Sequence, residues 1–129
     1  MSIVTATLDK TRELGLKKVG LLGTKFTMEA NFFSAPFSAQ GISVVVPPSC
    51  DQDYINDRLM HEIELGIITD DTRKGLLAVV ERMIAREKID AVILGCTELP
   101  LILDKSEFGI PFLNTTAIHV ERIVNYSRQ

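Results

Sequence analysis

The sequence has few cysteines, no excess of basic residues and no long apolar run, and each absence excludes a class of protein. Two cysteines in 129 residues form at most one disulfide, and neither has a CxxC partner or metal-site spacing, which excludes a disulfide-rich scaffold. The net charge of -3 does not suit electrostatic binding of nucleic acid, so we expect no nucleic-acid partner. No stretch approaches the roughly 20 apolar residues that a membrane-spanning helix requires.

The remaining composition is that of a soluble globular protein. Apolar residues make up 46% of the chain and charged residues 24%, and there is no low-complexity tract. The length fits one domain over residues 1–129. The first ten residues lack the basic and apolar regions of a signal peptide. We therefore expect a single-domain cytoplasmic protein with free thiols.

Short apolar runs separated by helical segments predict an α/β fold. The expected strands are Val19 to Leu22, Ile42 to Val46, Ala91 to Leu94 and Ile110 to Leu113. They are apolar throughout, as in a parallel sheet that is covered on both faces. The expected helices are Thr5 to Leu14, Thr27 to about Ala39 with a break near Pro36, Asp53 to Leu65, Asp71 to Glu87 capped by Thr69 or Asp70, and Thr116 to about Tyr126.

This alternation predicts an open, doubly wound, mainly parallel four-stranded sheet with strand order 2-1-3-4. In that order the first and third strands are neighbours, and their connections leave toward opposite faces of the sheet. Ligands of such folds bind beyond the carboxyl ends of the strands at this switch point. The two loops that open there are GTKFT, residues 23–27, and GCTELP, residues 95–100.

The first loop carries two hydroxyl groups at the start of a helix. Thr24 and Thr27 are three residues apart, and hydroxyls with helix-terminal amides can hold a carboxylate or phosphate. Alternatively, Thr27 only caps the helix and Thr24 is a turn residue. The spacing of a P-loop is absent.

The second loop places Cys96 between a strand and a short helical turn that begins near Thr97. A thiol at a helix N-terminus has a lowered pKa, which suits a nucleophile or a base. Glu98 suits the positive end of the helix dipole. A buried inert cysteine is the alternative interpretation.

Three stretches, VGLLGTKFTM, VILGCTELPLIL and IPFLNTTAIHVERIV, resemble the second half of the aspartate/glutamate racemases, which need no pyridoxal phosphate. The resemblance implies an isomerase without a cofactor or metal, acting on a small acidic amino acid. In that family two similar domains face each other, and each supplies one cysteine for proton transfer. It implies that Cys96 is catalytic, that Thr24, Thr27 and Thr97 bind the substrate carboxylate, and that Glu98 marks the aspartate/glutamate branch and belongs to the substrate site.

The sequence also departs from the family pattern. These 129 residues contain no counterpart of the family's first domain or of its cysteine, Cys50 matches no catalytic position, and Asn114 replaces a common Asp. We expect a fragment, association with a separate first-domain chain, or a homodimer that brings two Cys96 residues together. The alternative functions are a non-catalytic carboxylate-binding domain and a single-cysteine decarboxylase of the same superfamily.

Other polar and aromatic residues have structural explanations. His61 and His119 fall within predicted helices, where surface or packing roles are expected. Asp70 and Asp71 suit the start of a helix. The phenylalanines at positions 26, 32, 33 and 37 have helical spacing and are expected in the core.

Overall fold

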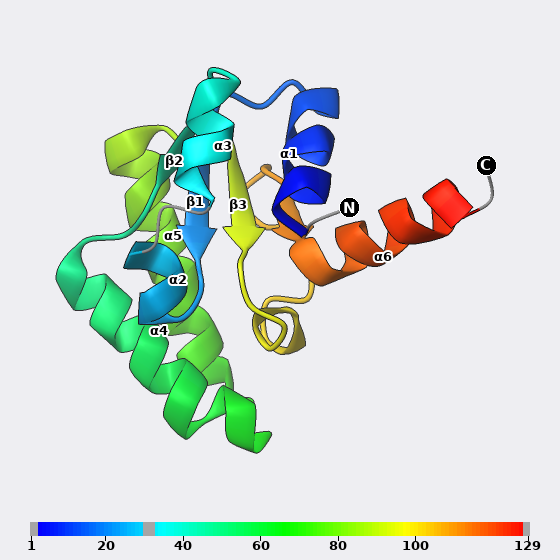
Figure 1. Ribbon diagram of the computed structural model, residues 1–129. Coiled ribbons are helices and arrows are strands. Elements are labelled where there is room, and N and C mark those ends of the chain that lie inside the picture. Colours follow the sequence, from blue (N-terminus) through cyan, green and yellow to red (C-terminus); the bar gives the residue numbers. More distant parts are fainter. Residues whose placement is uncertain (1–2, 30–32, 128–129) are drawn as a thin grey trace.

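Four parallel strands form the centre of the molecule in the order β2-β1-β3-β4 (Figure 1). The computed structural model describes residues 3–29 and 33–127. The strands are β1 (Lys18–Leu22), β2 (Ser43–Val45), β3 (Ala91–Leu94) and β4 (Phe112–Asn114), and all neighbouring pairs are parallel. The fold class and the strand order predicted from the sequence are confirmed.

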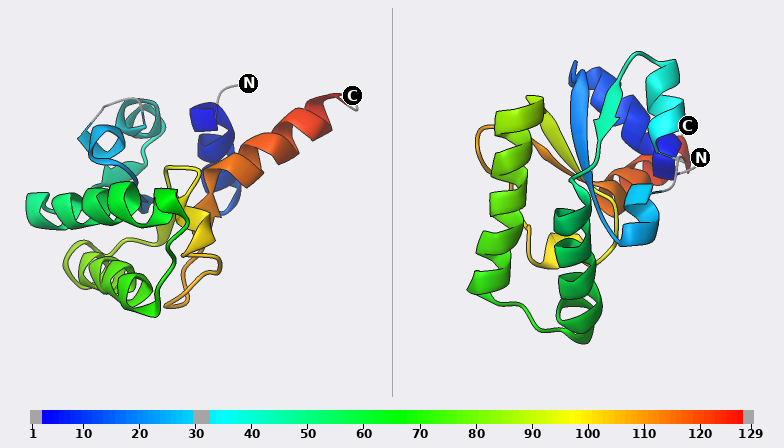
Figure 2. Two further views of the ribbon diagram at one scale, coloured as in Figure 1. Left: turned by 90° about the horizontal axis from the view of Figure 1, so that it is seen from below. Right: turned by 90° about the vertical axis from the view of Figure 1, so that its left-hand side faces the viewer.

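Helices cover both faces of this sheet, as the views from below and from the side show (Figure 2). The helices are α1 (Ile3–Glu13), α2 (Lys25–Glu29), α3 (Ser34–Ala39), α4 (Ser49–His61), α5 (Asp70–Glu87) and α6 (Thr115–Ser127), with short 3-10 helices η1 (Ile63–Leu65) and η2 (Leu99–Leu101). One apolar cluster lies between the sheet and α4, α5 and η2, and another lies between the sheet and α1, α3 and α6.

The strand β3 shows why its sequence is apolar throughout. Val92 and Leu94 belong to the first cluster, whereas Ala91 and Ile93 belong to the second. Successive side chains of a strand point to opposite faces, so a strand buried on both faces needs an apolar residue at every position.

The helix predicted over residues 27–39 is instead two short helices, α2 and α3. The first of them begins at Lys25, before Thr27, and Pro36 lies in the first turn of α3, where a missing N–H costs no helical hydrogen bond. Phe26 is 76% exposed, so its assignment to the core is wrong. The turn of α2 directs Met28 into the core instead, and Phe32 lies outside the described residues.

The other phenylalanines and the later helices are closer to expectation. Phe33 and Phe37 are buried. The helix expected from Asp53 begins four residues earlier, at Ser49, directly after two prolines. Thr69 caps α5 as predicted, since its hydroxyl accepts a hydrogen bond from the amide of Thr72 at 3.1 Å.

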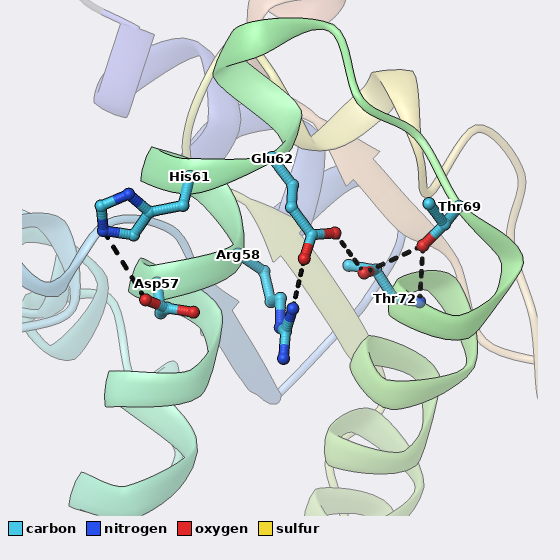
Figure 3. Close-up of polar contacts among 6 residues, drawn as sticks. All are labelled: Asp57, Arg58, His61, Glu62, Thr69 and Thr72. Atoms are coloured by element: carbon cyan, nitrogen blue, oxygen red, sulfur yellow. Dashed lines mark hydrogen bonds and ion pairs between the residues drawn. The ribbon is translucent and has the colours of Figure 1, made fainter.

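A polar network joins the end of α4 to the start of α5 (Figure 3). The Glu62 carboxylate is paired with the Arg58 guanidinium and accepts a 2.6 Å hydrogen bond from the Thr72 hydroxyl. The Thr69 hydroxyl in turn donates to the Thr72 hydroxyl at 3.1 Å. The hydrogen bond from Thr72, and then the one from Arg58, hold the pKa of Glu62 below its usual range.

This lowered pKa predicts an acid-sensitive contribution to stability. A folded-state pKa below the unfolded value stabilises the fold above the ordinary carboxyl pKa of about 4.3, and this contribution disappears as the pH falls. Glu62→Gln should therefore lower the urea midpoint at about pH 7 and have a smaller effect at about pH 3. Asp57→Asn is the matched control, because Asp57 contacts only the exposed His61 ring in Figure 3, at 3.7 Å. An equal loss for Glu62→Gln at both pH values would contradict the prediction.

Within the described part of the chain, no helix is both long and apolar enough to cross a membrane.

Candidate active site

The GTKFT and GCTELP loops meet at the carboxyl ends of β1 and β3. Leu22 and Leu94 are partners in the parallel register, and the Gly95 amide donates a 2.7 Å hydrogen bond to the Leu22 carbonyl. A Cβ atom on Gly95 would lie 2.9 Å from that carbonyl oxygen and 3.2 Å from the Thr27 methyl carbon. The glycine thus lets Thr27 of the first loop pack directly against the residue that precedes Cys96.

The two threonine hydroxyls of the first loop lie together. The Oγ1 atoms of Thr24 and Thr27 are 3.1 Å apart, and the Thr27 amide donates to the Thr24 hydroxyl at 3.3 Å. Thr24, and not Thr27, therefore caps α2. Because α2 has five residues, its dipole is small, and any anion would depend mainly on the two hydroxyls.

Two residues of α4 hold this loop in place. The Asn56 side-chain oxygen accepts a 2.8 Å hydrogen bond from the Lys25 amide, and the Lys25 ammonium lies 2.7 Å from the Asp53 carboxylate. Sequence reasoning missed both residues. They are about thirty positions from the loop in sequence, and no local spacing indicates such a contact.

Cys96 is half-buried at the end of β3 and packs against the apolar cluster beneath α4 and α5. Burial raises the pKa of its thiol, and hydrogen bonds from the amides of Leu99 and Glu98 oppose that rise only in part. The lowered pKa expected from the sequence is therefore wrong in direction. The following helix, η2, has three residues, too few for a dipole that outweighs the loss of water.

Nearby carboxylates act in the same direction as burial. The negative charges of Glu98 and Glu64 both raise the pKa of the Cys96 thiol, because they repel the thiolate. The sequence drew attention to Glu98 but not to Glu64, which lies in η1. Thr97, the other predicted site residue, is exposed beside Cys96.

The second cysteine is separated from this site. Cys50 is exposed in the first turn of α4, which follows β2. Because β1 lies between β2 and β3 and neighbouring strands are about 4.8 Å apart, the two thiols follow strands separated by roughly 10 Å. Among the described residues, no group of three or more His, Cys, Asp or Glu side chains is placed to hold a metal ion.

Asn114 stands at the end of β4, where it caps α6. Its side-chain oxygen accepts a 3.0 Å hydrogen bond from the Ala117 amide. The neighbouring Thr115 hydroxyl, which is buried, donates a 3.0 Å hydrogen bond to the Leu94 carbonyl and so ties the start of α6 to β3. Asp and Asn are equally good N-caps, so Asn114 can perform this structural role of an aspartate.

We predict that Asn114→Ala lowers the free energy of unfolding by about 1 kcal/mol, the usual value of an N-cap side chain. Asn114→Asp should retain the stability of the parent, because its carboxylate can accept the same hydrogen bond. Urea denaturation of the three proteins tests this. Equal losses for the Ala and Asp variants would show that capping is not the role of Asn114.

The family is decided by a sequence comparison. The family model described as Asp/Glu/Hydantoin racemase matches residues 1–123. The chain belongs to this family. The resemblance stated from the three sequence motifs is thereby confirmed.

Solved structures of racemase homologues have the same fold. A proposed Asp/Glu racemase from Yersinia pestis is 33% identical with a TM-score of 0.91, and the match covers 98% of this chain and 55% of the Yersinia chain. An aspartate racemase homologue from Pyrococcus horikoshii is 29% identical with a TM-score of 0.93, and the match covers 100% of this chain and 56% of the Pyrococcus chain. Glutamate racemase 3 from Caldanaerobacter subterraneus is 28% identical over 70% of this chain and 32% of its own length. The chain thus spans about half the length of these two solved relatives.

Proposed function

We propose that this chain supplies one half of a cofactor-independent amino-acid racemase site, with aspartate or glutamate as substrate and Cys96 as the group that transfers the proton. The packing of the Thr27 methyl group against Gly95 carries this proposal, because it brings the loop with the two threonine hydroxyls against the residue that precedes Cys96. Thr24, Thr27 and the exposed Thr97 are the donors to the substrate carboxylate. Glu98 completes the substrate site on the cysteine side.

The chemistry follows from these positions. The Cys96 thiolate takes the α-proton, and the electron pair left on the α-carbon spreads into the carboxylate, whose oxygens accept hydrogen bonds from the threonine hydroxyls. A second acid then returns a proton to the opposite face. In the reverse direction Cys96 is the acid, and its raised pKa keeps it protonated for that role.

The second acid has to come from outside the residues around Cys96. Cys50 follows a strand two positions away, so we propose a second copy of the chain, or a separate chain of the first-domain type, as its source. Exposed apolar residues on α6, which extends away from the body of the molecule in Figure 1, support such an association. Val120, Ile123 and Val124 are 54%, 45% and 40% exposed.

We also propose that the protein acts in the cytoplasm, because both of its cysteines are free, as is usual in a reducing compartment.

The test is incubation of the chain with L- and D-aspartate and L- and D-glutamate in deuterated water. Inversion with deuterium at the α-carbon supports two working acids, and exchange without inversion supports Cys96 acting alone, which would also suit a decarboxylase. If neither exchange nor inversion is observed, the proposal of a racemase half is overturned and a non-catalytic carboxylate-binding domain is favoured. Sedimentation at micromolar concentration reports the assembly, and a monomer that inverts substrate would contradict the shared site.

A matched pair of variants tests whether the hydroxyls of Thr24 and Thr27 bind the substrate carboxylate. Thr24→Ala/Thr27→Ala should weaken the binding of succinate, a substrate-like diacid, whereas Thr5→Ala, an exposed threonine of α1, should leave it unchanged. Equal binding by the double variant would remove the two hydroxyls from the proposed site.

A further inference from the structure

A separate cavity lies on the other side of β3 from the threonine loop. It has a volume of about 230 Å³ between η2, the segment after it and the carboxyl end of β4. Because the strand order is β2-β1-β3-β4, this cavity is next to β4, whereas Thr24 and Thr27 follow β1. It is lined by Leu94, Pro100, Leu103, Asp104, Lys105, Ser106, Phe112 and Asn114.

Three of the lining residues carry hydrogen-bond donors that are available to a ligand. The Ser106 oxygen already accepts a 2.9 Å hydrogen bond from the Phe112 amide, so its O–H remains free to donate. The Asn114 oxygen is used in capping α6, while its NH₂ group has no partner among the described residues. Lys105 adds an exposed ammonium, 3.9 Å from Glu107.

The other lining residues are one carboxylate and several apolar side chains. Asp104 is exposed and has no hydrogen bond or ion pair within the described ranges. Leu103 is buried, and Phe112 is half-buried against the same cluster. A few polar groups converging over an apolar base are the usual composition of a small-molecule site.

We propose that this cavity binds the zwitterion of a small amino acid. The ligand carboxylate accepts hydrogen bonds from the Ser106 hydroxyl, the side-chain NH₂ group of Asn114 and the Lys105 ammonium. The ligand ammonium pairs with Asp104, and a short side chain contacts Leu103 and Phe112. The volume of about 230 Å³ is below the usual range for drug-sized ligands, roughly 300 to 1,000 Å³, and suits a molecule of a few heavy atoms.

An amino acid bound in this cavity would contact η2, the short helix that follows Cys96. Pro100 and Leu103 line the cavity, and the Leu103 amide donates a 2.8 Å hydrogen bond to the Leu99 carbonyl. At the start of the same helix, the amides of Glu98 and Leu99 donate to the Cys96 sulfur. Binding in the cavity therefore changes the reactivity of the thiol, a consequence that does not require racemase activity.

The experiment uses the Cys96→Ala chain, which cannot carry out the proposed proton transfer, and L-alanine as the probe. Saturable shifts of the backbone amide signals of Ser106, Phe112 and Asn114 are expected in NMR spectra. Acetate and methylamine at the same concentrations should each cause smaller shifts, because each lacks one of the two charges. Asp104→Asn should weaken binding by up to about fivefold, as expected for an exposed ion pair.

Lys74→Gln, at an exposed position of α5, is the control for a change of surface charge and should bind as the parent does. The proposal is overturned by an absence of shifts, by shifts confined to the threonine loop, or by equal responses to acetate and L-alanine. The NMR experiment uses a chain without Cys96, so its failure would not affect the result of the exchange experiment, which depends on Cys96. A failure of the exchange experiment would leave this binding intact, so the two proposals fail separately.

A second measurement addresses the thiol. In the Cys50→Ser chain, L-alanine should change the rate at which iodoacetamide labels Cys96, and Asp104→Asn should reduce that change. An unchanged labelling rate at saturating L-alanine would remove the connection through η2.

Discussion

Replacing Cys96 by serine should lower the rate of α-proton exchange of aspartate or glutamate in deuterated water by at least about 10²-fold. A serine hydroxyl in the same place is a far weaker acid than a thiol, so it cannot act as the base at neutral pH. The loss of the α-proton signal in NMR spectra measures the rate directly. Cys50→Ser is the matched control and should exchange at the parental rate, because Cys50 is exposed at the start of α4. Equal losses in the two variants would exclude Cys96 as the specific base.

The pH dependence of this exchange has a defined sign. Burial raises the pKa of the Cys96 thiol above its ordinary value, so the thiolate is a minor species at neutral pH. The exchange rate should therefore rise as the pH increases through and beyond the ordinary thiol pKa of about 8.5. A rate that is already constant from about pH 7 upward would indicate a lowered pKa, the direction expected from the sequence alone.

The same residue shows where sequence reasoning reaches its limit. The position of Cys96, directly after a buried strand and before a helical turn, was predictable because strand periodicity and turn residues are local properties. The direction in which its pKa shifts was not predictable. It depends on how much apolar surface surrounds the thiol and on the charges of Glu64 and Glu98, which arise only in the folded chain.

Helix boundaries failed for a related reason. Thr27 and Asp53 both look like first residues of helices, yet α2 begins at Lys25 and α4 at Ser49. In the first case the cap is Thr24, and its loop is fixed by the Asn56 side chain, which comes from a helix about thirty residues later. Local propensity does not contain such a contact. The strand order, in contrast, followed from the alternation of elements and from the handedness of their connections.

The two loops of the candidate site are joined by a backbone contact that should be sensitive to a single methyl group. Gly95→Ala places a Cβ atom 2.9 Å from the Leu22 carbonyl oxygen, 2.9 Å from a methyl carbon of Leu21 and 3.2 Å from the Thr27 methyl carbon. The carbonyl belongs to β1 and accepts the Gly95 amide hydrogen bond, so it cannot move without a change in the pairing of β1 and β3.

We therefore expect Gly95→Ala to lower the free energy of unfolding by about 1 to 3 kcal/mol, the usual range for overpacking a core. Gly20→Ala is the matched control in a neighbouring strand. The atoms nearest to its added Cβ would be the flexible ends of Ile89 and Met83, each at 2.9 Å, and these side chains can rotate away. Urea denaturation should show the larger loss for Gly95→Ala, and equal losses would mean that the Leu22 carbonyl yields as easily as a side chain. Because the same displacement separates Thr27 from the Cys96 loop, Gly95→Ala should also lower α-proton exchange in the fraction of protein that remains folded, whereas Gly20→Ala should not.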